Sequence, residues 1–156
     1  MRRAKPEKRI IPPDVRYNNV TVQTMIQHMI SRGKKSLATR ILYEALDLIR
    51  ERNQGKDPIE IFETALKNVA PVMEVRPRRV GGATYQVPME VPPARRLTLA
   101  IRWVLTSARA RPGKSFPEKL ADELMDAYRG EGASIRKREE THKMAEANRA
   151  FSHYRI

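Results

Sequence analysis

Four groups of basic side chains carry the clearest chemistry in this sequence, because their residue types and spacing suit the binding of phosphate groups. Arginine binds phosphate through a planar, two-pronged guanidinium and also stacks on flat rings, whereas lysine acts as a compact point charge. The groups are Arg2, Arg3, Lys5, Lys8 and Arg9; then Lys34 and Lys35; then Arg76, Arg78 and Arg79 with Tyr85; and finally Arg95, Arg96, Arg102 and Arg109.

Three arginines of the last group are spaced by seven residues. Arg95, Arg102 and Arg109 therefore fall near one line of a helix, away from its apolar residues. Residues 94–114 contain six bases and no acid. We therefore expect that salt bridges do not explain this row, and that it contacts a polyanion.

The third group surrounds a proline and faces a tyrosine. Arg76, Arg78 and Arg79 flank Pro77, and a narrow ribbon of this kind enters a groove or junction of a nucleic acid. The alternative is an edge hairpin protected from aggregation by its charge. We expect the three arginines to be exposed, so that changing them together to alanine alters stability by less than about 0.5 kcal/mol.

The other two groups have simpler interpretations. Lys34 and Lys35 follow Gly33 at a predicted helix start, where free N–H groups and the helix dipole favour an anion. The N-terminal group forms a cationic arm that reaches phosphates, and its alternative is a tail that aids solubility.

Catalytic and metal-binding patterns are absent from the sequence. His28, His142 and His153 are far apart, and no pair has the spacing of a zinc protease. No cysteine is present, and no glycine-rich phosphate loop occurs. Glu139 and Glu140 lie among bases and are interpreted as ion-pair partners. We expect no catalytic residue, no metal and no cofactor.

The overall charge agrees with a polyanionic partner. The 156 residues include 31 Lys and Arg against 18 Asp and Glu, giving a net charge of +13. The excess lies in blocks separated by two acidic stretches, 44–63 and 115–131. Nucleic acid is the first candidate partner and a membrane surface the second. No apolar run approaches the roughly 20 residues of a membrane span, and no secretion signal is evident, so we expect a cytosolic protein.

Helical spacing of apolar residues dominates the chain. Gly33 is predicted to end the first helix, Asp57 and Ser115 to cap later helices, and Gly130 to close one. Helices are predicted from about Val22, Ala38, Pro58, Leu97, Ser115 and Ala133, the last of them ending near Phe151 and burying few large apolar side chains.

A hairpin interrupts this pattern. Gly81 and Gly82 lie between two runs that favour strands, and both central positions of a type I′ turn need positive φ. That turn places Arg78 opposite Tyr85 and Arg76 opposite Val87. A lone two-stranded ribbon is marginal in water, so the arm must pack on another element or gain order from a partner.

The fold class is therefore mainly α. We predict a single bundle of about six helices, with a two-stranded β-hairpin arm between the third and fourth helices. Residues 1–19 form a basic N-terminal arm, flexible or extended; 20–151 form the helical domain, with the hairpin arm at 72–91; and 152–156 form a tail.

From about Asp14 to Tyr154, nearly its whole length, the chain resembles the family of ribosomal protein seven of the small subunit, in its bacterial form. The hairpin stretch, residues 73–88, is the most specific part of the likeness. The other stretches that carry it are Gly33-Lys34-Lys35 with Ala38, Arg40, Ile41 and Tyr43; Ala100-Ile101-Arg102-Trp103; Lys137-Arg138-Glu139; 144–151; and His153-Tyr154.

This resemblance implies a function and a location. The family binds 16S ribosomal RNA in the 3′ major domain and nucleates assembly of the 30S head, near the decoding centre. Its implied partners are exit-site tRNA, mRNA and the small-subunit ribosomal proteins eleven, nine, thirteen and nineteen, with no membrane. The implied RNA contacts are the four basic groups above and, in the last helix and beyond, Arg138, Lys143, Arg149 and Tyr154.

Two other functions remain open at this point. An architectural DNA-binding protein would lay the basic helix in a groove and wedge the ribbon into the duplex. An RNA-processing enzyme would need an acid, base or metal set, which the sequence does not offer.

Overall fold

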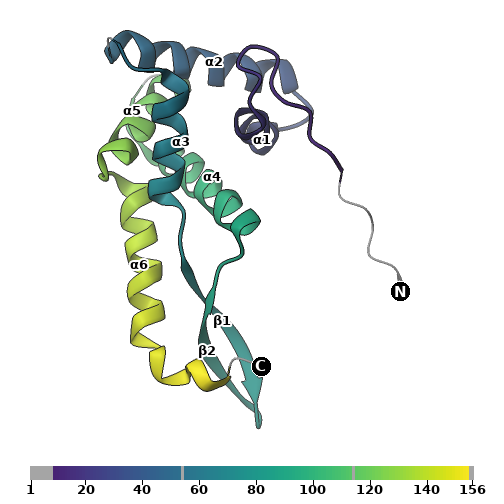
Figure 1. Cartoon of the computed structure of the whole chain (residues 1–156), viewed down its shortest axis with the longest axis vertical. Coiled ribbons are helices and arrows are strands. Elements are labelled where there is room, and N and C mark those ends of the chain that lie inside the picture. Colours follow the sequence, from purple (N-terminus) through teal and green to yellow (C-terminus); the bar gives the residue numbers. More distant parts are fainter. Residues whose placement is uncertain (1–8, 54, 114, 155–156) are drawn as a thin grey trace.

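The structure is a computed structural model that describes residues 9–53, 55–113 and 115–154. Over these residues the chain forms six α-helices with a β-hairpin between α3 and α4, which confirms the predicted fold class (Figure 1). In order, the elements are α1 (Val20–Met29), α2 (Lys35–Arg52), α3 (Pro58–Val69), β1 (Met73–Val80), β2 (Ala83–Glu90), α4 (Pro93–Ala110), α5 (Phe116–Arg129), α6 (Ala133–Ala147) and the 3-10 helix η1 (Arg149–Tyr154).

The hydrophobic core lies among the first five helices. α5 packs against α2, α3 and α4, so it is the central helix of the bundle. Its buried Leu120 and Leu124 meet Phe62 of α3, Leu46 of α2 and Ile101 of α4 within one cluster. The α6 helix and the hairpin extend away from this bundle side by side (Figure 1).

Local signals at the helix ends agree with the predictions in three places. The carboxylate of Asp57 accepts a hydrogen bond from the Ile59 N–H (3.0 Å), and Ser115 accepts one from the Glu118 N–H (3.5 Å). Gly130 ends α5 in a left-handed conformation. Each residue satisfies backbone groups that the helix itself leaves unpaired.

The end of α1 differs from the prediction. The helix stops at Met29, and Gly33 is therefore not its closing residue. Ile30 already has an extended ψ of 125°, and the chain then reverses through Arg32 and Gly33, both with positive φ. Gly33 belongs to the turn that leads into α2, where Lys34 occupies the N-cap position.

The hairpin has the predicted register. Arg78 pairs with Tyr85 and Arg76 with Val87 across an antiparallel ladder. Gly81 (φ 58°) and Gly82 (φ 89°) form the turn, and residues that carry a side chain rarely adopt such φ values.

The ribbon gains its order by packing on the end of the chain. α6 lies along β1, and η1 lies against β2 (Figure 1). The N–H of Val72, just before β1, donates a hydrogen bond to Nε2 of His142 on α6 (3.0 Å). The first of the two alternatives for the hairpin, packing on another element, is therefore confirmed.

The last helix is shorter than predicted. It ends at Ala147, where the side-chain amide of Asn148 donates to the carbonyl of Met144, and η1 follows. As expected, it buries few large side chains: its buried residues are Ser134, Ile135, Thr141 and Ala145.

The segment before α1 is held against α2 by an acidic residue. Asp14 is buried and accepts hydrogen bonds from the N–H groups of Arg16 and Tyr17 and from the hydroxyl of Tyr43. Burial raises the pKa of Tyr43, which keeps this hydroxyl protonated and able to donate. Arg16 also forms two hydrogen bonds to Asp47 on α2. Asp14 and Arg16 therefore fix the segment just before α1 to α2.

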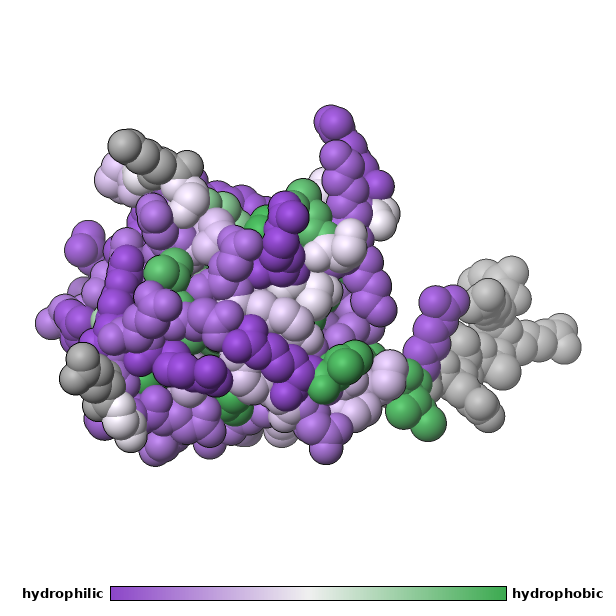
Figure 2. Space-filling view, turned by 90° about the horizontal axis from the view of Figure 1, so that it is seen from above, coloured by the Kyte–Doolittle hydropathy of each residue, from purple (hydrophilic) through white to green (hydrophobic). Residues whose placement is uncertain are grey.

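The face at the α2 end of the molecule is hydrophilic over most of its area (Figure 2). Small hydrophobic areas interrupt it without forming a continuous band. Within the described ranges, no helix combines the length and apolar character that a membrane crossing needs.

Candidate nucleic-acid interface

The basic row on α4 lies on the solvent side of that helix. Arg95, Arg102 and Arg109 are exposed, whereas the buried residues of α4 form the opposite side. Within the described residues, Arg102 and Arg109 form no salt bridge. Their guanidinium groups are therefore available to a polyanion.

Arg95 and Arg96 differ from this expectation. The prediction that no acid neutralises the row is wrong for them, because Arg95 contacts Glu74 of β1 (3.0 Å) and Arg96 contacts Glu90 of β2 (2.8 Å). Both acids lie outside residues 94–114, so a count of charges within that stretch misses them. These two arginines join the start of α4 to the base of the hairpin.

The hairpin arginines differ from one another in their surroundings. Arg76 is exposed as predicted but also contacts Glu74 (2.6 Å), whereas Arg78 is half-buried, so the prediction of exposure is wrong for Arg78 alone. Arg79 is exposed near the turn. Glu74 itself is only 8% exposed, which makes Arg76 and Arg95 the counter-charges of a buried carboxylate.

Tyr85 on β2 packs against the end of the chain. Its ring lies 5.4 Å from the ring of Phe151 in η1, at an angle of 44°. Aromatic pairs prefer such tilted geometry over a parallel sandwich. Tyr85, which the sequence predicts to contact RNA, thus packs the hairpin against η1.

One cation of the second basic group and one of the fourth meet in space. Lys34 of the turn before α2 and Arg109 of α4 line one surface hollow, of about 440 Å³, together with Arg32. Lys35 lies beside them at the first position of α2. Seventy-odd residues of chain separate these cations, and only the fold brings them together.

The RNA-contact residues predicted in the last helix and beyond also differ in their surroundings. Arg138 donates to the carbonyl of Asn68 (2.5 Å), Arg149 pairs with Glu146 (3.3 Å), and Lys143 is exposed. Tyr154 ends η1. In the N-terminal arm, Arg9 is exposed, while Arg2, Arg3, Lys5 and Lys8 lie outside the described residues.

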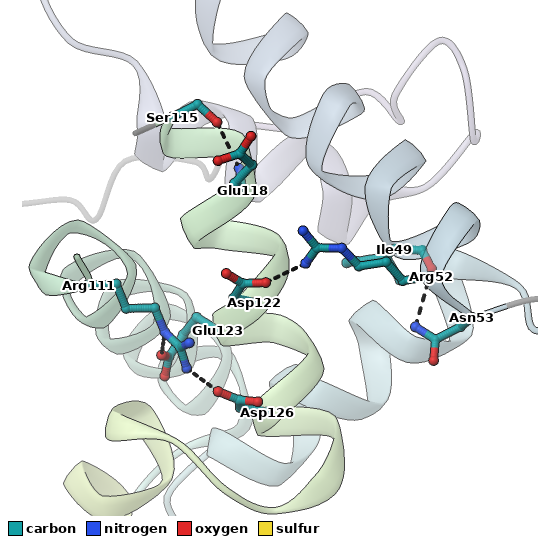
Figure 3. Close-up of polar contacts among 9 residues, drawn as sticks. All are labelled: Ile49, Arg52, Asn53, Arg111, Ser115, Glu118, Asp122, Glu123 and Asp126. Carbon is teal, nitrogen blue, oxygen red and sulfur yellow. Dashed lines mark hydrogen bonds and ion pairs between the residues drawn. The ribbon is translucent and has the colours of Figure 1, made fainter. Parts of the chain in front are cut away.

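Sequence analysis missed a charged cluster that joins the end of α4, α5 and the start of α6 (Figure 3). Arg111, directly after α4, contacts Glu123 of α5 (2.6 Å) and also Asp126. Glu123 is fully buried and accepts hydrogen bonds from both the N–H (2.9 Å) and the hydroxyl (2.6 Å) of Ser134 at the start of α6. The sequence signal that could have predicted this cluster is the positive charge of Arg111 shortly before the acidic stretch 115–131.

No catalytic or metal-binding arrangement is seen in the part of the chain that the structure describes. The histidines, aspartates and glutamates there form no group of three suited to a metal ion. His142 instead accepts a backbone hydrogen bond, and burial together with nearby Arg138 lowers its pKa.

Comparisons with known proteins decide the family. The profile of the family "Ribosomal protein S7p/S5e" matches residues 1–149. The chain is 60% identical over 153 residues to the small ribosomal subunit protein uS7 of Chloroflexus aurantiacus, covering 98% of this chain and 97% of that protein. It is 57% identical over 154 residues to the protein of the same name from Acaryochloris marina, covering 99% and 98%.

The chain belongs to the ribosomal protein S7p/S5e family. The resemblance drawn from the hairpin and helix motifs is therefore confirmed. Membership of this family makes the chain a structural component of the small ribosomal subunit.

Proposed function

We propose that this chain is a primary 16S rRNA-binding structural protein of the small ribosomal subunit. It binds the 3′ major domain and nucleates assembly of the 30S head, near the decoding centre. Its role is to bind and to organise RNA, not to catalyse a reaction. The observation that carries the proposal is the meeting of Lys34 and Arg109 at one surface: they are two exposed cations from distant segments, and neither forms a salt bridge with a carboxylate of residues 9–53, 55–113 or 115–154.

The hairpin arm supplies a second contact in this proposal. It extends beyond the bundle with Arg79 exposed near its turn (Figure 1). An arm of this shape reaches RNA that the bundle does not touch, and exit-site tRNA and mRNA are its proposed targets. Ribosomal protein eleven is the proposed neighbour, and ribosomal proteins nine, thirteen and nineteen share the head. The protein acts in the cytoplasm as part of the ribosome.

The test is a salt titration of binding to a transcript of the 16S 3′ major domain. Neutralising around six phosphates gives a slope of log K against log salt near −5. An affinity that barely changes with salt would contradict the proposal.

A competition experiment separates RNA from DNA as the partner. Duplex DNA of equal charge is added at fixed salt to the protein and the transcript. We expect the transcript to be preferred, because a protruding arm together with a separate concave basic surface fits a folded RNA better than a uniform groove. Preference for DNA would favour an architectural DNA-binding protein instead.

A further inference from the structure

A hollow lies where four helices of the bundle approach one another. The end of α1, the turn before α2, the first half of α2, the end of α4 and the start of α5 all contribute to it. Its volume of about 440 Å³ lies within the range of small-molecule pockets, roughly 300–1,000 Å³. Its lining residues are Met29, Ser31, Arg32, Lys34, Leu37, Ala38, Ile41, Arg109 and Phe116.

The floor of this hollow is apolar. Phe116 and Ile41 are half-buried and pack against the core, and Leu37 is 38% exposed. Apolar side chains of this kind are usually covered by a neighbouring helix or strand. Here they form a concave surface open to solvent, and a flat, apolar group would fill it.

The rim of the hollow is cationic. Arg32, Lys34 and Arg109 are exposed, and none of the described residues that line the hollow is acidic. No side chain caps the N-terminus of α2 beside them, so backbone donors add to the positive potential. Arg32 is held at a positive φ of 52°, an unusual value for a residue with a side chain.

We propose that this hollow receives one unpaired nucleobase of the bound RNA, with the adjoining phosphates on the cationic rim. The base stacks on Phe116 and against Leu37, while Lys34 and Arg109 contact the phosphates. An apolar floor with a cationic rim complements a nucleotide, which is a flat ring attached to negative charge. The inference rests on the proposed function, since it adds a base-specific contact to the RNA surface.

The experiment fills the hollow without removing a cation. The variant Ser31→Trp places a large ring at its edge, and Gln27→Trp, on an exposed position of α1 outside the hollow, is the matched control. Leu37→Ser removes part of the apolar wall instead. Affinity for the 3′ major domain transcript is measured at several salt concentrations, and thermal melting checks that each variant folds.

We expect Ser31→Trp and Leu37→Ser to weaken binding about 10-fold or more, in line with the loss of one stacked base. The slope of log K against log salt stays that of the unmodified protein, because every cation remains. Gln27→Trp binds like the unmodified protein. Ultraviolet crosslinking then joins Phe116 to one nucleotide.

Other outcomes overturn the inference. Normal RNA binding by both variants shows that no base enters, and if such variants nevertheless assemble poorly into subunits, the occupant is another protein. A loss of affinity with a flatter salt slope shows an electrostatic effect only. If the unmodified protein itself binds the transcript without salt dependence, the proposed function fails as well, so the two failures are distinguishable.

Discussion

Nε of Arg111 lies 2.6 Å from a carboxylate oxygen of Glu123, and this contact joins the end of α4 to the buried side of α5 (Figure 3). Burial by itself lowers the pKa of Arg111, but hydrogen bonds to Asp126 and Glu123 outweigh it and raise the pKa above its usual value. The guanidinium therefore stays charged and balances a fully buried carboxylate.

Removing Arg111 leaves that carboxylate without its counter-charge. Arg111→Met is expected to lower the free energy of unfolding by about 3–5 kcal/mol in urea denaturation. Arg109→Met, an exposed position on the same helix, is the control and changes it by less than about 0.5 kcal/mol. The double variant with Glu123→Gln recovers part of the loss, and equal stability of Arg111→Met and Arg109→Met would refute this account.

Gly132 must be a glycine because Glu123 passes close to it. A Cβ there would lie 3.2 Å from Oε1 of Glu123, at a φ of 96°. Gly55 has nearly the same φ, 97°, with nothing within 4 Å, so Gly55→Ala measures backbone strain alone. Both alanine variants lose about 1–3 kcal/mol through strain. Gly132→Ala is expected to lose more than Gly55→Ala in chemical denaturation, and the reverse order would be inconsistent with the contact.

The unpaired arginines of α4 are expected to act through charge. Arg102→Ala and Arg109→Ala each weaken binding to the rRNA transcript and flatten the salt slope by about 0.7–0.9. Their melting temperatures stay unchanged. Arg52→Ala, whose guanidinium is paired with Asp122, is the control and leaves the slope as it was. If Arg102→Ala and Arg109→Ala had the same salt slope as the Arg52→Ala control, the α4 row would not contact phosphate groups.

The arginines of the hairpin are expected to separate into two kinds. Arg76→Ala removes a partner of the buried Glu74 and lowers stability by about 1–2 kcal/mol. Arg79→Ala, near the turn, leaves stability unchanged and weakens RNA binding. Thermal melting and a filter-binding assay measure the two effects. If both variants melt like the unmodified protein, Glu74 does not depend on Arg76.

Acid is expected to loosen the contact between α6 and the hairpin. His142 accepts from the Val72 N–H, so a proton on Nε2 would place two donors face to face. The pKa of His142 lies below 6.5 in the folded chain, because of burial and then Arg138. The unfolded chain therefore binds the proton first, and stability falls as pH drops below about 6.5.

The measurement is the melting temperature between pH 7.5 and pH 5. His142→Gln keeps an acceptor that does not titrate, so its melting temperature declines less over this range. His28→Gln, exposed on α1, is the control and declines like the unmodified protein. An identical decline in both variants would remove His142 as the cause.

Local sequence signals predicted the elements and one pairing of this fold. The Gly81-Gly82 pair predicted the register of the hairpin. Both glycines have the positive φ values that the central positions of a type I′ turn need, so the turn is centred on them. Asp57 and Ser115 marked helix starts through hydrogen bonds that reach only two or three residues. These features depend on neighbours in the sequence, which is why they were predictable.

The charged contacts were not predictable in the same way. Arg95 was expected to be free because its own segment holds no acid, yet Glu74 lies 21 residues earlier. The end of α6 was also placed too late, because the amide of Asn148 competes for a helix carbonyl. Of the candidate site, the sequence therefore indicated the residues, and the fold decided which of them stay available to RNA.

The hairpin, α6 and η1 are in contact at both ends of the hairpin, so they form a closed loop of packed elements. Val72 is joined to His142 at one end, and Tyr85 touches Phe151 at the other. A displacement of the hairpin is therefore resisted by α6 and η1 as well as by the two strand ends. Because Glu123 accepts hydrogen bonds from Ser134 in the first turn of α6, this buried carboxylate contributes to the orientation of α6 and of the hairpin that packs on it.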